Sequence, residues 1–134
     1  MNFIASLGRG FAALVLVLVV TVLPAQAATS LVPAFADLQP HGPATAEGVV
    51  IWSHGRSLTR EDSESATPAY LRSFADGGWD VLRFNRPRAE DILETSAADL
   101  AARVHALKKA GYRKIVLAGQ SYGGFIALEA AHGN

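Results

Sequence analysis

The stretch 114-KIVLAGQSYGGFIALEAAHGN-134 carries the strongest structural signal in the chain. Residues 114–119 form an apolar run typical of a buried strand, and residues 122–132 are apolar on most faces, which predicts a buried helix. Between them stands Gly119-Gln120-Ser121-Tyr122-Gly123. A sharp strand-to-helix turn exposes the hydroxyl of such a serine, and its crowded backbone needs small residues two positions before and after it. We therefore expect Ser121 to be a nucleophile, with a purely structural turn as the alternative.

Two further buried strands are expected upstream, at residues 49–53 (VVIWS) and 79–84 (WDVLRF). With helices between them, the order β-α-β-α-β-α predicts an α/β fold with three parallel strands. The loops at the carboxyl ends of parallel strands lie at one edge of the sheet. The loop His54-Gly55-Arg56 should therefore lie near the turn that carries Ser121.

The helices between the strands have start and stop signals. The first is expected to begin at Thr67-Pro68, where the threonine oxygen would cap it, and to end at Gly77-Gly78. Its predicted apolar face is Tyr70, Leu71 and Phe74. The second is expected to begin at the capping-box pattern of residues 96–99 and to end at Gly111. Its predicted apolar stripe is Ala97, Leu100, Val104 and Leu107, and Lys108 and Lys109 suit its C-terminal end.

The first 27 residues have the layout of a secretory signal peptide. Arg9 precedes an apolar run, and Ala25-Gln26-Ala27 has the small-residue pattern of a cleavage site. The run is shorter than the roughly 20 residues of a membrane span, so we expect cleavage after Ala27 and a secreted or periplasmic protein, with an uncleaved anchor as the alternative. Residues 28–47 should form an irregular lead-in, in which one short edge strand would fit, before the domain at 48–134.

Composition narrows the function classes. Twelve basic residues balance twelve acidic ones, which gives no basic patch for nucleic acid, and the absence of cysteine excludes disulfides and thiolate metal sites. No strand is followed by a phosphate-binding lysine motif or by G-x-G-x-x-G, so no nucleotide cofactor is expected. No other cofactor or metal is expected either.

The segments SHGR (53–56), GGWDVLRFNRPR (77–88) and GQSYGG (119–124) together resemble the α/β-hydrolase family, over roughly residues 48–134. The branch that they resemble is that of esterases and lipases, or of dienelactone-hydrolase-like enzymes. The resemblance implies hydrolysis of a small ester or acyl substrate with Ser121 as the nucleophile. It implies that the backbone N–H groups of Tyr122 and Arg56 bind the oxyanion. It also gives supporting roles to His54, Gly55, Gly119, Gln120 and Gly123. His54 would orient the backbone of its loop by hydrogen bonds, and the alternative is that it acts as the catalytic base.

A serine nucleophile needs a base and an orienting acid, which in this family follow the serine along the chain. The only candidates after Ser121 are Glu129 and His132, which lie on the helix that begins at the serine, about 12 and 16 Å along it at ~1.5 Å per residue. Neither reaches the hydroxyl. His105 should be a surface residue of the second helix, and His41 lies in the lead-in.

We therefore expect a domain truncated before its triad acid and histidine, with the missing C-terminal half as its partner. The last strand and helix should expose a flank that this half would cover. Two functions therefore remain as alternatives, and the sequence does not decide whether the chain is an enzyme. One is an exported serine hydrolase, and the other is a catalytically inactive remnant or an interaction-only half-domain.

Three arginines, Arg83, Arg86 and Arg88, follow the second strand close to the predicted site. They would be able to hold a substrate carboxylate or phosphate. The interpretation that we prefer is a solvated loop, in which the acidic residues at 90, 91 and 94 are their partners.

Overall fold

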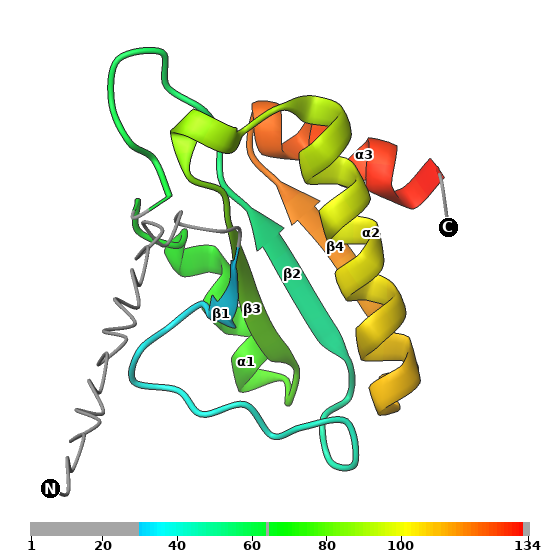
Figure 1. The fold of residues 1–134 in the computed structure, drawn as a ribbon. Helices are drawn as coiled ribbons and strands as arrows, with labels where there is room; N and C mark the ends of the chain where they lie inside the picture. Colours follow the sequence, from blue (N-terminus) through cyan, green and yellow to red (C-terminus); the bar gives the residue numbers. More distant parts are fainter. Residues whose placement is uncertain (1–29, 64, 133–134) are drawn as a thin grey trace, which may run out of the picture.

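The computed structural model of the chain describes residues 30–63 and 65–132, which form one sheet with helices on both faces (Figure 1). The predicted signal peptide, residues 1–27, lies outside the described residues. The α/β fold is confirmed, and its elements in chain order are β1 Ser30–Pro33, β2 Val49–Ser53, the 3-10 turn Ala69–Leu71, α1 Arg72–Asp76, β3 Asp80–Asn85, the 3-10 turn Arg88–Glu90, α2 Leu93–Ala110, β4 Ile115–Gly119 and α3 Tyr122–His132.

The sheet has the strand order β1-β3-β2-β4, which is the three predicted strands and one short edge strand from the lead-in. β2 is parallel to β3 on one side and to β4 on the other, so the three predicted parallel strands are confirmed. The fourth strand, β1, lies in the predicted lead-in and pairs antiparallel with β3. Its place at the sheet edge suits Pro33, because proline has no N–H to give to a further strand.

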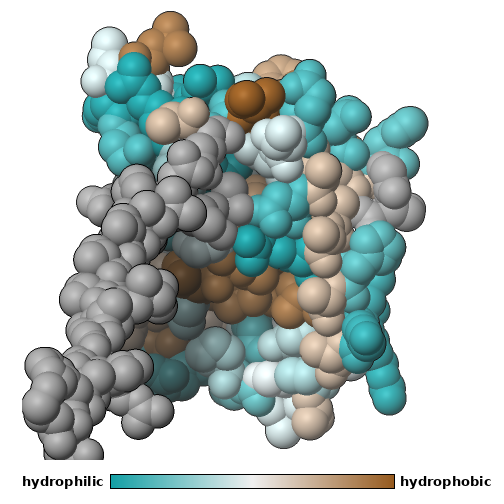
Figure 2. Space-filling model, in the orientation of Figure 1, coloured by the Kyte–Doolittle hydropathy of each residue, from teal (hydrophilic) through white to brown (hydrophobic). Residues whose placement is uncertain are grey.

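Two apolar layers hold the sheet. α2 and α3 cover one face, where Leu100 and Ile126 pack with the β2 residues Val49 and Ile51. α1 and the turn before it cover the other face, where Leu71 packs with Trp52. Figure 2 shows the molecule in the orientation of Figure 1. Hydrophobic residues gather in the middle of this face, and hydrophilic residues surround them. β2 is buried along its whole length, as its continuous apolar sequence predicts.

The predicted cap of the first helical segment and the predicted start of α2 are wrong. Thr67 makes no capping hydrogen bond, and Tyr70 is 67% exposed, so the apolar face of this segment consists of Leu71 and Phe74. α2 begins at Leu93, one turn before the predicted capping box, and the hydroxyl of Ser96 instead lies 3.1 Å from the Asp91 carboxylate. The remainder of α2 agrees with the prediction.

The apolar stripe of α2 faces the core, and Lys108 and Lys109 occupy its last turn. The helix ends at Gly111 with a φ of 114°, a left-handed conformation that favours glycine.

α3 is only half buried, whereas the sequence predicted a buried helix. Ile126 and Ala130 face the core, but Phe125 and Leu128 are 65% and 71% exposed. β4 is an edge of the described sheet, and its Val116 is 37% exposed. The flank of β4 and α3 is therefore open, as expected, and a groove of about 580 Å³ runs between α2, β4 and α3.

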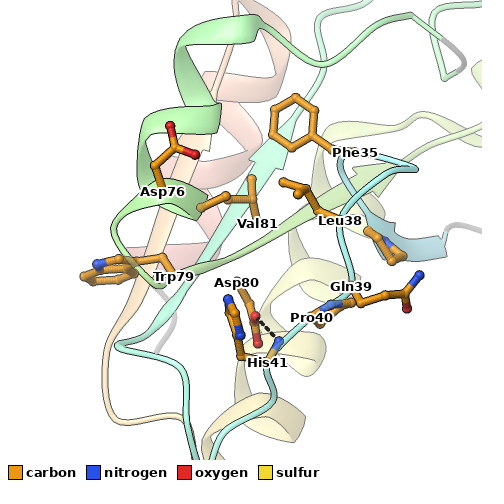
Figure 3. A pocket seen from close by; sticks show the side chains of 11 residues that line it. Phe35, Leu38, Gln39, Pro40, His41, Asp76, Trp79, Asp80 and Val81 are labelled. Atoms are coloured by element: carbon orange, nitrogen blue, oxygen red, sulfur yellow. Dashed lines mark hydrogen bonds between the residues drawn. The ribbon is translucent and has the colours of Figure 1, made fainter.

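Asp80, at the start of β3, ties the lead-in to the sheet. Its buried carboxylate accepts hydrogen bonds from the backbone N–H groups of His41 and Gly42 and from the hydroxyl of Tyr112. Figure 3 shows Asp80 and His41 at the wall of a cavity of about 130 Å³ between the lead-in and α1. This cavity lies at the amino end of β3, the end opposite the predicted site.

The Tyr112–Asp80 contact predicts a pH dependence of stability. Burial, the hydrogen bond to Asp80 and the charge of Asp80 raise the pKa of Tyr112 above its usual value of about 10. The unfolded chain therefore releases this proton first, and the stabilisation is present below pH ~10 and lost as the pH rises above it. Urea unfolding between pH 9 and 11 should show a smaller loss of stability in Tyr112→Phe than in wild type. Tyr70→Phe, at an exposed tyrosine, should match wild type, and an equal loss in Tyr112→Phe would contradict the assignment.

Candidate functional site

Ser121 lies at the turn between the end of β4 and the start of α3, and it is exposed. Its φ is 51°, and it is the one non-glycine residue with a positive φ in the described part of the chain. A serine in this left-handed conformation is strained, by an amount of order 1–3 kcal/mol, and persists only where its surroundings enforce it. The predicted strand-turn-helix around Ser121 is therefore present, and its turn residue has a strained backbone.

Two glycines enforce this turn. A Cβ on Gly123 would lie 2.2 Å from the carbonyl oxygen of Ser53, and one on Gly119 would lie 2.3 Å from the carbonyl oxygen of Gly123. Real Cβ atoms do not approach so closely, so larger residues would push α3 away from β2 and β4. The N–H of Gln120 also donates to the Ser53 carbonyl at 3.1 Å, which fixes the turn to the end of β2.

The loop after β2 lies beside Ser121, as the sequence predicted. A Cβ on Gly55 would stand 3.8 Å from the Cβ of Ser121 and 3.4 Å from the carbonyl oxygen of Gln120. On the next residue, the Arg56 guanidinium carbon lies 5.4 Å from the ring centroid of Tyr122. The structure thus brings together Ser121, Tyr122 and the His54-Gly55-Arg56 loop.

The backbone N–H groups at this place are partly free. Those of Gly123 and Gly124 donate to the carbonyls of Gln120 and Ser121, at 2.9 and 2.8 Å. Those of Tyr122 and Arg56 have no acceptor among residues 30–63 and 65–132. The N–H of Tyr122 also belongs to the start of an 11-residue helix, where the helix dipole favours negative charge. Free donors beside an exposed hydroxyl suit an oxyanion that forms there.

His54 is buried, and both of its ring nitrogens have partners. Nε2 accepts the backbone N–H of Arg86 at 3.0 Å, so Nδ1 carries the proton and donates to the Gly55 carbonyl at 2.6 Å. Burial and, next, the charge of Arg86 lower the pKa of His54 below its usual value of about 6.5. His54 is therefore a neutral imidazole that holds the backbone of its loop, and neither nitrogen is left to take a proton from Ser121.

For Arg86, the preferred interpretation is right about the partner and wrong about the solvent. Asp91, one of the expected acidic partners, pairs with it, but Arg86 is fully buried, which the sequence did not predict. Its guanidinium pairs with Asp91 at 2.9 Å and donates to the Ser53 hydroxyl at 2.6 Å and the His54 carbonyl at 2.5 Å. Arg86 thus joins the loop after β2, the loop after β3 and the residues before α2.

The other two arginines of this group differ from each other. Arg83 is buried, so the solvated-loop interpretation is wrong for it as well; its guanidinium lies over Trp52 and donates to the carbonyl of Ser63. Arg88 is exposed, as that interpretation requires, and its side chain donates to the carbonyl of Leu58. Both side chains therefore donate to backbone carbonyls of the loop after β2.

No base contacts Ser121 in the described part of the chain. Glu129 and His132 are exposed near the far end of α3, and His105 is exposed on α2, as predicted. His41 lies beside Asp80, away from the carboxyl ends of the strands. The same residues include no group of acidic, histidine or cysteine side chains that would bind a metal ion. Among the helices that the structure describes, none has the length and apolar character needed to cross a membrane.

Comparison with known proteins gave no relative: no family model, no curated protein and no solved structure matches the chain.

The buried Arg86–Asp91 pair predicts a large effect on stability. Arg86→Met should lower the free energy of unfolding by about 3–5 kcal/mol, because it leaves the buried Asp91 carboxyl without its cationic partner. The control is Arg60→Met, which removes an exposed pair with Asp62 and should change stability by less than about 1 kcal/mol. Urea unfolding measures both. A loss in Arg86→Met no larger than that in Arg60→Met would contradict the role of Arg86.

Proposed function

We propose that this protein is an exported serine hydrolase that cleaves esters or related acyl compounds through Ser121. The observation that carries the proposal is the left-handed backbone of Ser121 between β4 and α3, held by two glycines that have no room for a side chain. A turn that needed only to change direction would place glycine at the strained position. Serine at that position presents a hydroxyl to solvent, which is what nucleophilic catalysis requires.

The geometry supports a two-step acyl transfer. The Ser121 oxygen attacks the carbonyl carbon of the ester, and the hydroxyl proton passes to a base. The carbonyl oxygen becomes an oxyanion, which accepts hydrogen bonds from the N–H groups of Tyr122 and Arg56. The proton then goes to the departing alkoxide, and water releases the acyl group from the serine in the same way.

The base of this scheme is not among the described residues. We propose that full activity requires an acid and a histidine supplied by a further segment, in the order that the resemblance to α/β-hydrolases implies. The same resemblance makes the sheet the core of such a hydrolase, with β2 before the oxyanion loop and β4 before the nucleophile. Export, with cleavage after Ala27, is part of the proposal and rests on the sequence of residues 1–27.

The second candidate function is a catalytically inactive remnant or an interaction-only half-domain. Two observations favour it. The described histidine beside the site, His54, is held by Arg86 and Gly55. The flank of β4 and α3 is apolar and open, with Phe125 and Leu128 exposed. A half-domain that binds a partner would need this flank and would not need a reactive serine.

Labelling of the full chain with a neutral fluorophosphonate separates the two candidates, because the reagent bonds covalently to nucleophilic serines. A hydrolase site without its base should react slowly, with the label on Ser121, and should hydrolyse p-nitrophenyl acetate at a trace rate. Enzymes that lack triad members keep a rate advantage of order a thousandfold over water from the oxyanion hole and binding. Peptide mass spectrometry after hours of incubation locates the label.

Two variants make this result specific. Ser121→Ala should remove the label and the trace hydrolysis. His132→Ala should leave both as in wild type, since His132 lies at the far end of α3. A label on another serine, or no label on Ser121, would refute the hydrolase and leave the interaction-only half-domain.

A further inference from the structure

Arg56 presents an exposed cation beside the candidate nucleophile. Its guanidinium lies on the ring of Tyr122, the residue after Ser121, and its main chain follows Gly55, which lies against Ser121. The guanidinium carbon lies 5.4 Å from the Tyr122 ring centroid, and the Arg56 side chain is exposed. This position makes Arg56 able to meet a substrate bound at Ser121.

The acidic side chains that line the surface hollow around Arg56 are Glu61, Asp62 and Asp91, and each has another partner. Asp91 pairs with Arg86, and Asp62 pairs with Arg60 at 3.0 Å. Glu61 accepts the backbone N–H groups of Arg88 and Ser63, and these bonds lower its pKa to about 2. None of them lies within ion-pair distance of Arg56.

The charges around the hollow do not balance. Its lining includes four arginines but three carboxylates, and the buried His54 is neutral. Arg60 and Arg86 are ion-paired, whereas the Arg88 guanidinium donates to the neutral Leu58 carbonyl. Among the described residues, Arg56 and Arg88 therefore have no carboxylate partner, and Arg56 is the one that lies beside Ser121.

We propose that the Arg56 side chain binds an anionic group of the substrate, so that the site takes acyl compounds bearing a free carboxylate, such as half-esters of short dicarboxylic acids. This inference rests on the proposed function, whose site it shares. The planar guanidinium matches a carboxylate with two parallel hydrogen bonds. The Arg56 backbone N–H serves the oxyanion, so one residue would contact both ends of a short substrate. Arg56 is in this sense a specificity-determining residue.

Two small probes of equal size test the proposal without requiring any reaction. Monomethyl succinate carries the carboxylate, and methyl succinamate has a neutral amide in its place. NMR titration of the full ¹⁵N-labelled chain at low salt measures the affinity of each. We expect the carboxylate probe to bind about tenfold more tightly or better, since hydrogen bonds between two charged groups are stronger than those to a neutral amide. Added salt should reduce the difference.

Three variants assign the preference. Arg56→Gln should abolish it, and Arg56→Lys should keep part of it, because lysine keeps the charge but loses the planar fork. Arg60→Gln, at an exposed arginine of the same loop, should keep it in full. Equal affinities in wild type, no binding of either probe, or a preference that survives Arg56→Gln would each overturn the proposal.

The titration and the serine labelling can fail separately. The carboxylate preference should persist in Ser121→Ala, because it does not use the hydroxyl. A preference without any labelling of Ser121 would refute the hydrolase and retain an anion-binding site at Arg56. Labelling without a preference would retain the hydrolase and refute the carboxylate substrate.

Discussion

At Gly123, the first turn of α3 lies against the carbonyl groups of Ser53 and His54 with no space for a side chain. This contact fixes the helix directly on the end of the central strand β2. Because β4 pairs with β2 in register, the chain between β4 and α3 must reverse within two residues, and Ser121 takes a left-handed backbone as a result. The exposed hydroxyl and the free N–H of Tyr122 both follow from this close approach.

Buried polar contacts complete the other half of the site. Arg86 binds the Ser53 hydroxyl, the His54 carbonyl and Asp91, and its own N–H holds the His54 ring. An arginine with these partners fixes the loop that carries Arg56, whereas an exposed arginine would leave it free to move. The apolar sheet thus sets where the two loops meet, and this polar network sets how their backbone groups are directed. Arg56 then lies next to the serine without a carboxylate partner among the described residues.

The sequence predicted the three parallel strands, the Gly111 helix end and the meeting of the two loops, because continuous apolar runs and glycines act locally. It did not predict the start of α2. Ser96 lies inside this helix, and its hydroxyl donates to the Asp91 carboxylate and does not cap the helix. Nor did it predict the burial of Arg86. One of the partners that hold this side chain, Ser53, lies 33 residues earlier in the chain. Contacts between distant segments have no local pattern. The open flank of β4 and α3 was expected, but the apolar sequence of α3 alone had predicted a buried helix, because periodicity cannot reveal whether a neighbour covers an apolar face.

The closest test of this account compares two adjacent glycines in α3 by urea unfolding. A Cβ on Gly123 would meet backbone at 2.2 Å, whereas one on Gly124 would have its nearest neighbour at 3.7 Å. Gly123→Ala should therefore destabilise the fold by about 3 kcal/mol or more, since a well-packed backbone cannot yield. Gly124→Ala should be neutral or stabilising by up to about 1 kcal/mol, because alanine is the better helix former. Equal effects of the two substitutions would show that α3 does not lie against β2 as described, and that the position of Ser121 has another cause.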